Sequence, residues 1–114
     1  MRNALLRGVE LFNTGEYFEA HEVWEEIWTA ERGPRRVFLQ ALIHCAVAMH
    51  HHSTGNALGA VRQFRKAIAK LERFPPECEQ IAAGALLAWS REALDSVGQG
   101  RTPPPCTIKV LTPS

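Results

Sequence analysis

The sequence has no apolar run near the ~18 residues that a membrane-spanning helix needs. Its first residues, Met-Arg-Asn-Ala-Leu-Leu-Arg-Gly, contain no long apolar core of the kind that a secretory signal requires. Apolar residues make up 46% of the chain and charged residues 22%, which is ordinary for a soluble globular protein. We therefore expect a cytoplasmic protein with no membrane contact.

Cysteine and net charge are also scarce. The three cysteines are widely spaced and form neither a Cys-x-x-Cys pair nor a zinc-finger pattern, so free thiols in a reducing cytoplasm are expected. A formal net charge of +1 argues against a general nucleic-acid binder, which is usually strongly basic. The 114 residues suffice for one domain with its own hydrophobic core.

Apolar periodicity and turn residues predict an all-α fold, a single-domain bundle of about five helices. Glycine-containing turns at Asn13-Thr14-Gly15 and Thr54-Gly55-Asn56, and prolines after residues 33 and 74, separate the helices. Asn56 is a good N-cap. The expected helices cover residues 2–12, 16–31, 35–53, 57–73 and 77–97. We expect residues 1–98 to form the bundle and residues 99–114 a proline-rich extended tail packed on or near it, with at most a short extended segment at residues 107–111.

A faint internal repeat with an offset of 40 residues runs through this plan. It pairs Gly15 with Gly55 and Trp24 with Phe64. Each half then forms a helical hairpin, loosely like the unit of tetratricopeptide repeats, although the ~34-residue period of those repeats is not kept. Any two antiparallel amphipathic helices share much of this pattern, so a common origin of the halves stays open.

The second expected helix carries the first candidate site. His21 and Glu25 are four residues apart, so they lie on one face of the helix, inside the rim of its apolar arc. A carboxylate placed there needs a partner, because burying an unpaired charge costs several kcal/mol. The pair can hold a metal ion or a proton, or simply form a polar contact within the core. The tryptophans Trp24, Trp28 and Trp89 are expected in the core.

The third expected helix is apolar nearly all round, with one polar stripe. Gln40, His44 and His51 fall within about 40° of one another on a helical wheel. His21, Glu25 and His44 are the best candidate ligands for Zn²⁺, Fe²⁺ or Mn²⁺. His51 lies ~10.5 Å along the axis from His44, so it is given an outer role, as are Gln40 and Glu22. Such a metal would lower the pKa of a bound water for hydrolysis.

Two other interpretations stay open. The polar groups can form a buried hydrogen-bond network that fixes helix register without a metal. The chain can also be a non-catalytic interaction module, in which Arg62, Arg65, Lys66 and Lys70 face an acidic protein partner. The partner is then an unknown small molecule or protein, and a homodimer is open because helices of this kind commonly pair. A cysteine nucleophile is disfavoured, since Cys45 lies on the buried helix away from His44.

The run from Leu11 to Trp28, with Gly15, Tyr17-Phe18-Glu19-Ala20-His21-Glu22 and Trp24-Glu25, resembles the signature of the family known as domain of unknown function 309. The stretches of residues 38–44 and 55–60 also resemble it, and the resemblance covers about residues 3–73. It implies a compact all-helical bundle, cytoplasmic, with no established activity. Relatives labelled as predicted metal-dependent hydrolases imply a metal site at His21, Glu22 and Glu25.

Overall fold

Short capping and turn motifs divide the chain into five helices. The computed structural model describes residues 3–111, and residues 1, 2 and 112–114 lie outside this description. Within the described part the regular elements are all helices. In the same part, two isolated antiparallel β-bridges join residue 78 to residue 81 and residue 81 to residue 110. The predicted all-α bundle of five helices is confirmed. The helices are α1 (Ala4–Asn13), α2 (Tyr17–Ala30), α3 (Gly33–Ser53), α4 (Ala57–Leu71) and α5 (Ala83–Gly98).

The two helical hairpins, α1–α2 and α3–α4, are closed by the same turn. Gly15 and Gly55 have φ angles of 83° and 80°, in the left-handed region that glycine adopts without steric cost. The next residue donates its N–H back across the turn at 2.8 Å in both cases, from Glu16 to Leu11 and from Asn56 to His51. As expected, Asn56 caps α4, because its side-chain oxygen accepts from the N–H of Gly59 at 2.9 Å. The offset of 40 residues is thus a repeat of backbone geometry.

A third copy of this turn ends α5 but leads to no sixth helix within the described residues. Gly100 has a φ of 74°, and Arg101 donates its N–H to the carbonyl of Ser96 at 2.8 Å. The sequence then runs through Pro103-Pro104-Pro105, which lack the N–H groups that a helix needs. From here on the chain takes the extended path that proline favours. We call residues 101–111 the tail.

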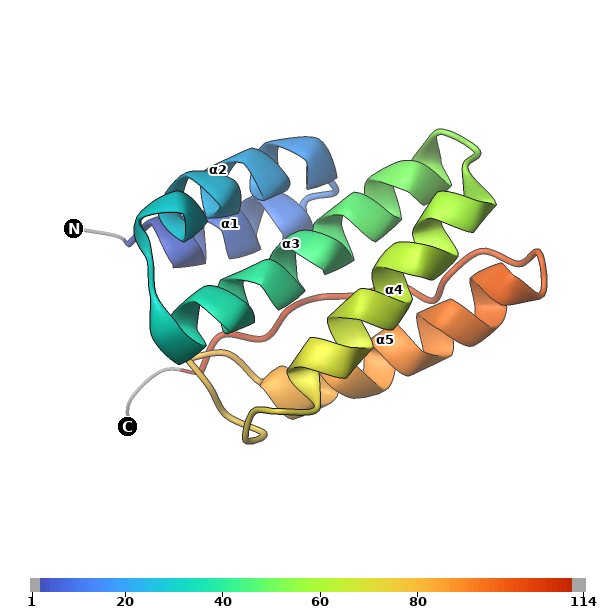
Figure 1. Cartoon of the computed structure of the whole chain (residues 1–114). Coiled ribbons are helices and arrows are strands. Elements are labelled where there is room, and N and C mark those ends of the chain that lie inside the picture. Colours follow the sequence, from blue (N-terminus) through green and yellow to red (C-terminus); the bar gives the residue numbers. More distant parts are fainter. Residues whose placement is uncertain (1–2, 112–114) are drawn as a thin grey trace.

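The core lies around α3, which packs between α2 and α4, while α1 packs on α2 and α5 on α4 (Figure 1). Trp24 is completely buried, and its indole N–H donates to the carbonyl of Leu5 at 2.9 Å. Gly8 allows this contact, because a Cβ atom there would lie 2.2 Å from the Trp24 indole nitrogen. Trp89 is 8% exposed, so it also belongs to the core as expected. Trp28 is only partly buried at the edge of the core.

The prediction that the fifth helix begins near residue 77 is wrong. Residues 77–82 instead form a tight loop with left-handed backbone at Glu79 and Gln80, and α5 begins at Ala83. Ile81 is fully buried and forms bridges to Cys78 within the loop and to Val110 in the tail. The apolar residues here, which predicted a helix, therefore belong to a loop that places the side chain of Ile81 in the core. The predicted ends of the other helices differ from the observed ones by about two residues, which is normal for helix termini.

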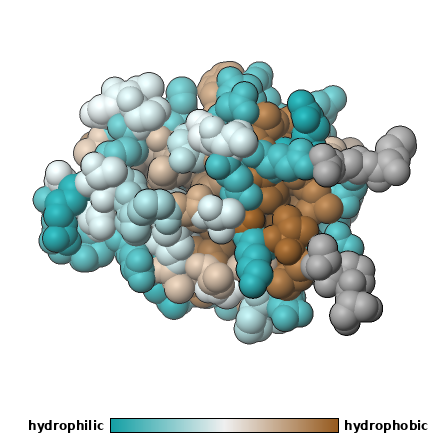
Figure 2. All heavy atoms as spheres, turned by 180° about the vertical axis from the view of Figure 1, so that it is seen from behind, coloured by the Kyte–Doolittle hydropathy of each residue, from teal (hydrophilic) through white to brown (hydrophobic). Residues whose placement is uncertain are grey.

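The tail returns across the bundle between α1 and α5 (Figure 1). Its described part packs on the bundle, with Pro103 and Ile108 buried. The division into a bundle of residues 1–98 and a tail of residues 99–114 stays a prediction, and residues 1, 2 and 112–114 of that division lie outside the described part of the chain. On the face seen from behind, apolar surface gathers beside the two ends of the described chain (Figure 2). Among residues 3–111 no helix is both long and apolar enough to cross a bilayer.

Candidate functional site

His21 and Glu25 make the contact that their spacing predicts. The Nε2 atom of His21 lies 2.6 Å from an Oε atom of Glu25, one turn further along α2. The other ring nitrogen, Nδ1, lies 3.3 Å from the carbonyl oxygen of Phe18. The His21 side chain is 23% exposed and that of Glu25 50% exposed. His21 is thus half-buried beside the Phe18 ring, whose centroid lies 5.5 Å from that of His21, whereas Glu25 is exposed rather than partly buried as expected.

His44 is held by α4. Its Nδ1 atom donates to Oε1 of Gln63 at 2.7 Å, and its Nε2 atom accepts from the ammonium of Lys70 at 3.1 Å. Burial lowers the pKa of His44, and the positive charges of Lys70 and Lys66 lower it further, against the opposing effect of the Gln63 hydrogen bond. The ring is therefore the neutral tautomer that carries its proton on Nδ1.

A small hollow lies beside His44 and Glu25. It has a volume of about 110 Å³ and lies between α2 and α3, and we call it the α2–α3 pocket. Three of the predicted site residues line it, Glu25 from α2 and Gln40 and His44 from α3. Trp28 and Ile43 complete the wall. A carboxylate, an amide and an imidazole thus line one hollow, and their role as a functional site stays a prediction.

Trp28 has a different role from the one expected. It forms a wall of the α2–α3 pocket, and the guanidinium of Arg36 lies 4.1 Å from its ring centroid, a cation–π contact. Its indole N–H is buried and finds no hydrogen-bond acceptor among the residues that the structure describes. Buried polar groups of this kind are rare in folded proteins. This edge of α2 therefore has an unused donor beside the pocket residues.

Glu22 and His51 lie outside the pocket wall. Glu22 is exposed on the outer side of α2. The Nδ1 atom of His51 lies 3.3 Å from the side-chain nitrogen of Asn56, at the turn between α3 and α4. The predicted outer roles of these two residues stay predictions, and the observed contact of His51 is with the cap of α4.

The described residues do not contain a preformed metal centre. Across residues 3–111 no three side chains of the His, Cys, Asp and Glu types are grouped closely enough to hold an ion. His21 and Glu25 supply two ligand atoms in contact, but the Nε2 atom of His44 faces the Lys70 ammonium. A cation near that nitrogen would meet the positive charge of Lys70. Zn²⁺, Fe²⁺ or Mn²⁺ at the predicted trio therefore requires His44 to change its partner.

Sequence reasoning missed Gln63 and Lys70. They are seven residues apart on α4, so they share a face, and this spacing was the available signal. The sequence could not predict that both side chains contact His44 of α3. The cysteines conform to expectation, since all three are free. Burial raises the pKa of the Cys45 thiol to about 12, which makes it a poor nucleophile at neutral pH.

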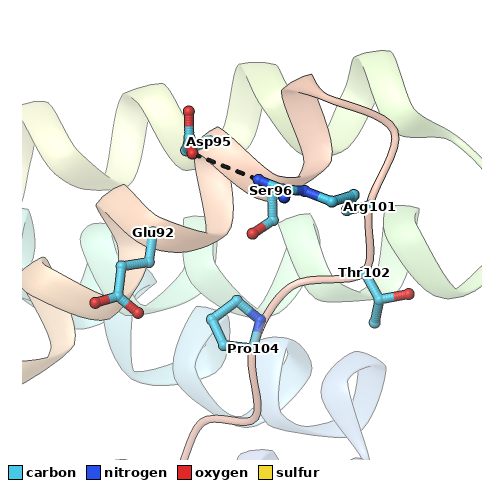
Figure 3. Close-up of a pocket in the computed structure, with 6 residues that line it drawn as sticks. All are labelled: Glu92, Asp95, Ser96, Arg101, Thr102 and Pro104. Carbon is cyan, nitrogen blue, oxygen red and sulfur yellow. Dashed lines mark ion pairs between the residues drawn. The ribbon is translucent and has the colours of Figure 1, made fainter.

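The basic residues of α4 have different surroundings along the helix. Arg65 is exposed, whereas Lys70 is partly buried against His44. A second hollow, of about 450 Å³, opens between the end of α5 and the start of the tail, and Figure 3 shows the six residues that line it. This hollow lies at the root of the tail, and none of its lining residues belongs to the α2–α3 pocket.

Comparison with known proteins gives relatives of unknown function. The family described as domain of unknown function (DUF309) matches residues 5–63. An uncharacterized protein of Aquifex aeolicus (strain VF5) is 27% identical over 93 residues, which cover 81% of this chain and 28% of that protein. The uncharacterized protein YpuF of Bacillus subtilis (strain 168) is 37% identical over 65 residues, which cover 56% of this chain and 37% of that protein. The chain thus spans about a third of the length of these relatives.

Proposed function

The chain belongs to the DUF309 family, and we propose that it binds a small polar molecule in the α2–α3 pocket. The observation that carries this proposal is the convergence of Glu25, Gln40 and His44 from two helices on one hollow of about 110 Å³. Pockets of this kind, apolar with a few convergent polar groups, are the usual binding sites of small ligands.

The charges around the pocket favour a ligand with both a donor and an acceptor. Glu25 presents a carboxylate from α2, which accepts hydrogen bonds or pairs with a cation. On the other side, Lys70 places a positive charge behind His44. The Gln40 amide offers a donor and an acceptor between them. A small dipolar or zwitterionic molecule fits this distribution of charge.

A divalent metal ion at His21 and Glu25 is the second candidate. The observation in its favour is the orientation of His21, whose Nδ1 faces a backbone carbonyl while its Nε2 faces a carboxylate. Histidines that ligate metals commonly have their second nitrogen fixed in this way. Metal-dependent hydrolysis, which the family resemblance implies, would need a third protein ligand, and His44 could serve only after it leaves Lys70.

The environment of the protein also remains a proposal. We infer a reducing, cytoplasmic location, because Cys45, Cys78 and Cys106 are all free thiols. The basic residues of α4 are proposed to face an acidic protein partner. A homodimer also stays a proposal. These proposals do not depend on the ligand of the pocket.

The test is nuclear magnetic resonance of untagged protein with elemental analysis alongside. The probes are zinc chloride and a panel of small amines, carboxylates and amino acids. We expect the indole resonance of Trp28 and the ring resonances of His44 to shift saturably with one of them. Gln40→Ala should abolish the shift caused by a polar ligand, and His21→Ala should abolish the shift caused by zinc. Glu19→Ala, a matched control at an exposed position of α2 outside the pocket wall, should abolish neither.

Two outcomes would count against the proposal. The first is the absence of bound metal and of any saturable shift in the wild-type protein. The second is a shift that persists in both Gln40→Ala and His21→Ala while these variants remain folded. Either result would indicate that the His and Glu side chains form a hydrogen-bond network that only stabilises the fold. It would favour the interpretation of the chain as an interaction module.

A further inference from the structure

The hydrogen bonds that hold the tail on the bundle are made to its backbone. The side-chain amide of Asn13 donates to the carbonyl of Ile108 at 3.0 Å and accepts from the N–H of the same residue at 2.7 Å. The indole N–H of Trp89 donates to the carbonyl of Pro104 at 2.8 Å. Both side chains come from helices, Asn13 from the last residue of α1 and Trp89 from the middle of α5. Such bonds recognise an extended chain of any sequence.

The loop before α5 extends this recognition by a short bridge. The N–H of Ala82 donates to the carbonyl of Lys109 at 3.0 Å, and the N–H of Leu111 donates to the carbonyl of Gln80 at 2.7 Å. These bonds resemble the addition of a strand to a sheet edge, a common way for proteins to bind extended peptides. Together with Asn13 and Trp89, the loop defines a binding surface that we call the α1–α5 groove.

Side-chain selectivity in the groove comes from packing alone. Ile108 is 3% exposed and Pro103 is also buried, so these two residues anchor the tail. Between them the fit is incomplete. A cavity of about 140 Å³ remains between residues 105–109 of the tail and a wall formed by Ala82 of the loop and by Ala85, Leu86 and Trp89 of α5. The small side chains in the middle of the tail therefore leave apolar space that a larger residue could fill.

The root of the tail is weakly attached. Arg101 reaches back over Ser96 toward Asp95 (Figure 3), but the two charged groups are 3.9 Å apart and their side chains are 63% and 67% exposed. Exposed pairs of this kind contribute little to stability. The open hollow of about 450 Å³ separates this segment from α5. At its root the tail is therefore held by the bond from the Arg101 N–H to the Ser96 carbonyl and by the buried Pro103 rather than by this ion pair.

We propose that the α1–α5 groove is a binding site for an extended, proline-containing apolar peptide of a partner protein, and that the tail occupies it as an intramolecular competitor. The backbone of the partner peptide takes over the hydrogen bonds that the tail's backbone makes to the side chains of Asn13 and Trp89 and to the 80–82 loop. It competes by placing a side chain larger than those of the tail in the cavity against α5. The tail, being tethered, acts at a high effective concentration and thereby sets the threshold for partner binding.

The first test measures release of the tail in the full-length protein by thiol labelling, with each cysteine resolved by mass spectrometry. Cys106 lies half-buried in the tail, and burial raises its pKa to about 12, so it reacts slowly while docked. Cys45 is fully buried in α3 and reacts only on global unfolding. We expect Cys106 to react much faster than Cys45. Asn13→Ala, which removes two hydrogen bonds to the tail, should speed Cys106 labelling about tenfold or more without changing that of Cys45.

Gln99→Ala is the matched control, since Gln99 also carries an amide at the end of a helix but bonds to Asp95 rather than to the tail. The second test adds a synthetic peptide of residues 101–111 with Cys106→Leu to the full-length protein. We expect saturable binding, seen by fluorescence anisotropy, that accelerates labelling of Cys106 in the protein. The peptide with Cys106→Ser should bind at least about tenfold more weakly, because it leaves the cavity unfilled.

Three results would overturn the proposal. Equal labelling rates of Cys106 and Cys45 would show that the tail leaves only when the whole molecule unfolds. Failure of both peptides to bind an Ile108→Ala protein, whose tail has lost its buried anchor while the groove is intact, would show that the groove accepts no second chain. A concentration-dependent dimer that exchanges tails, with no binding of peptide, would assign the groove to a second copy of this chain.

Discussion

His44 shows how a single residue is defined by its surroundings. In sequence it is one of five histidines, and in the structure it links α3 to α4 through Gln63 and Lys70. Both partners suit the neutral ring, because one accepts from Nδ1 and the other donates to Nε2. Protonation of Nε2 would place the ring's positive charge beside two lysines and break the bond to Lys70. The bundle therefore favours the neutral form of His44.

This arrangement predicts a pH-dependent stability. The pKa of His44 is lowered from its ordinary value of 6.5, so the unfolded chain takes up a proton at a higher pH than the folded one. The contribution of His44 is fully present above pH 6.5 and is lost as the pH falls through the lowered value. We expect His44→Gln to unfold at nearly the wild-type temperature at about pH 8 and to lose less stability than the wild type between about pH 6.5 and about pH 5. Parallel curves for the two proteins in thermal melts at both pH values would contradict this expectation.

At the scale of elements, the repeated glycine turn sets the arrangement of the helices. Gly15, Gly55 and Gly100 all have a left-handed backbone, and the residue after each bonds back to the end of the preceding helix. The residues after the turn then decide the course of the chain. A helix-forming sequence after Gly15 and Gly55 gives a hairpin, whereas the three prolines after Gly100 give the tail. The same glycine turn thus leads to two helical hairpins and to the tail.

The turn predicts an opposite response at two glycines that both have open space. No atom lies within 4 Å of the position of an added Cβ at Gly55 or Gly98, so neither substitution causes a clash. Gly55 has a φ of 80°, and we expect Gly55→Ala to lower the free energy of unfolding by about 1–2 kcal/mol. Gly98 is the last residue of α5, where Gly98→Ala should be neutral or raise that free energy by up to about 1 kcal/mol. Urea denaturation followed by circular dichroism measures both, and an equal effect of the two changes would mean that the left-handed backbone at Gly55 carries no cost for alanine.

At the scale of the whole molecule, the tail completes the core that the helices leave open. Ile108 lies 95 residues from Asn13 in sequence yet exchanges two hydrogen bonds with it. Ile81, in the loop before α5, bridges to Val110 and is fully buried. The first helix and the end of the tail are thus tied together across the bundle. Contacts between such distant positions are the ones that depend on the complete fold.

The tail should therefore contribute measurably to global stability. Replacing a buried isoleucine by alanine removes apolar contact and leaves a cavity, so Ile108→Ala should lower the free energy of unfolding by about 2–4 kcal/mol. Thr107→Ala, at an exposed neighbouring position, should change it by less than about 0.5 kcal/mol. Urea unfolding of both variants, followed by tryptophan fluorescence, provides the measurement. A loss below about 0.5 kcal/mol for Ile108→Ala would show that docking of the tail does not stabilise the bundle.

The sequence by itself determined the features that depend on neighbours along the chain. The five helices follow from apolar periodicity, the turns from Gly15 and Gly55, and the extended tail from its prolines. The contact of His21 with Glu25 was also predictable, because residues four apart on a helix always share a face. Each of these involves at most a few residues in succession, so local geometry suffices.

Only the tertiary structure decided which distant groups meet. The helical wheel of α3 placed Gln40 and His44 on one polar stripe. Because α3 packs between α2 and α4, His44 bonds to Lys70 of α4, whereas Gln40 lines a pocket together with Glu25 of α2. The 77–82 loop was mistaken for helix, because its apolar pattern also suits a loop with a single buried anchor at Ile81. The path of the tail depends on hydrogen bonds to Asn13 and Trp89, which form only once the helices that carry them have packed.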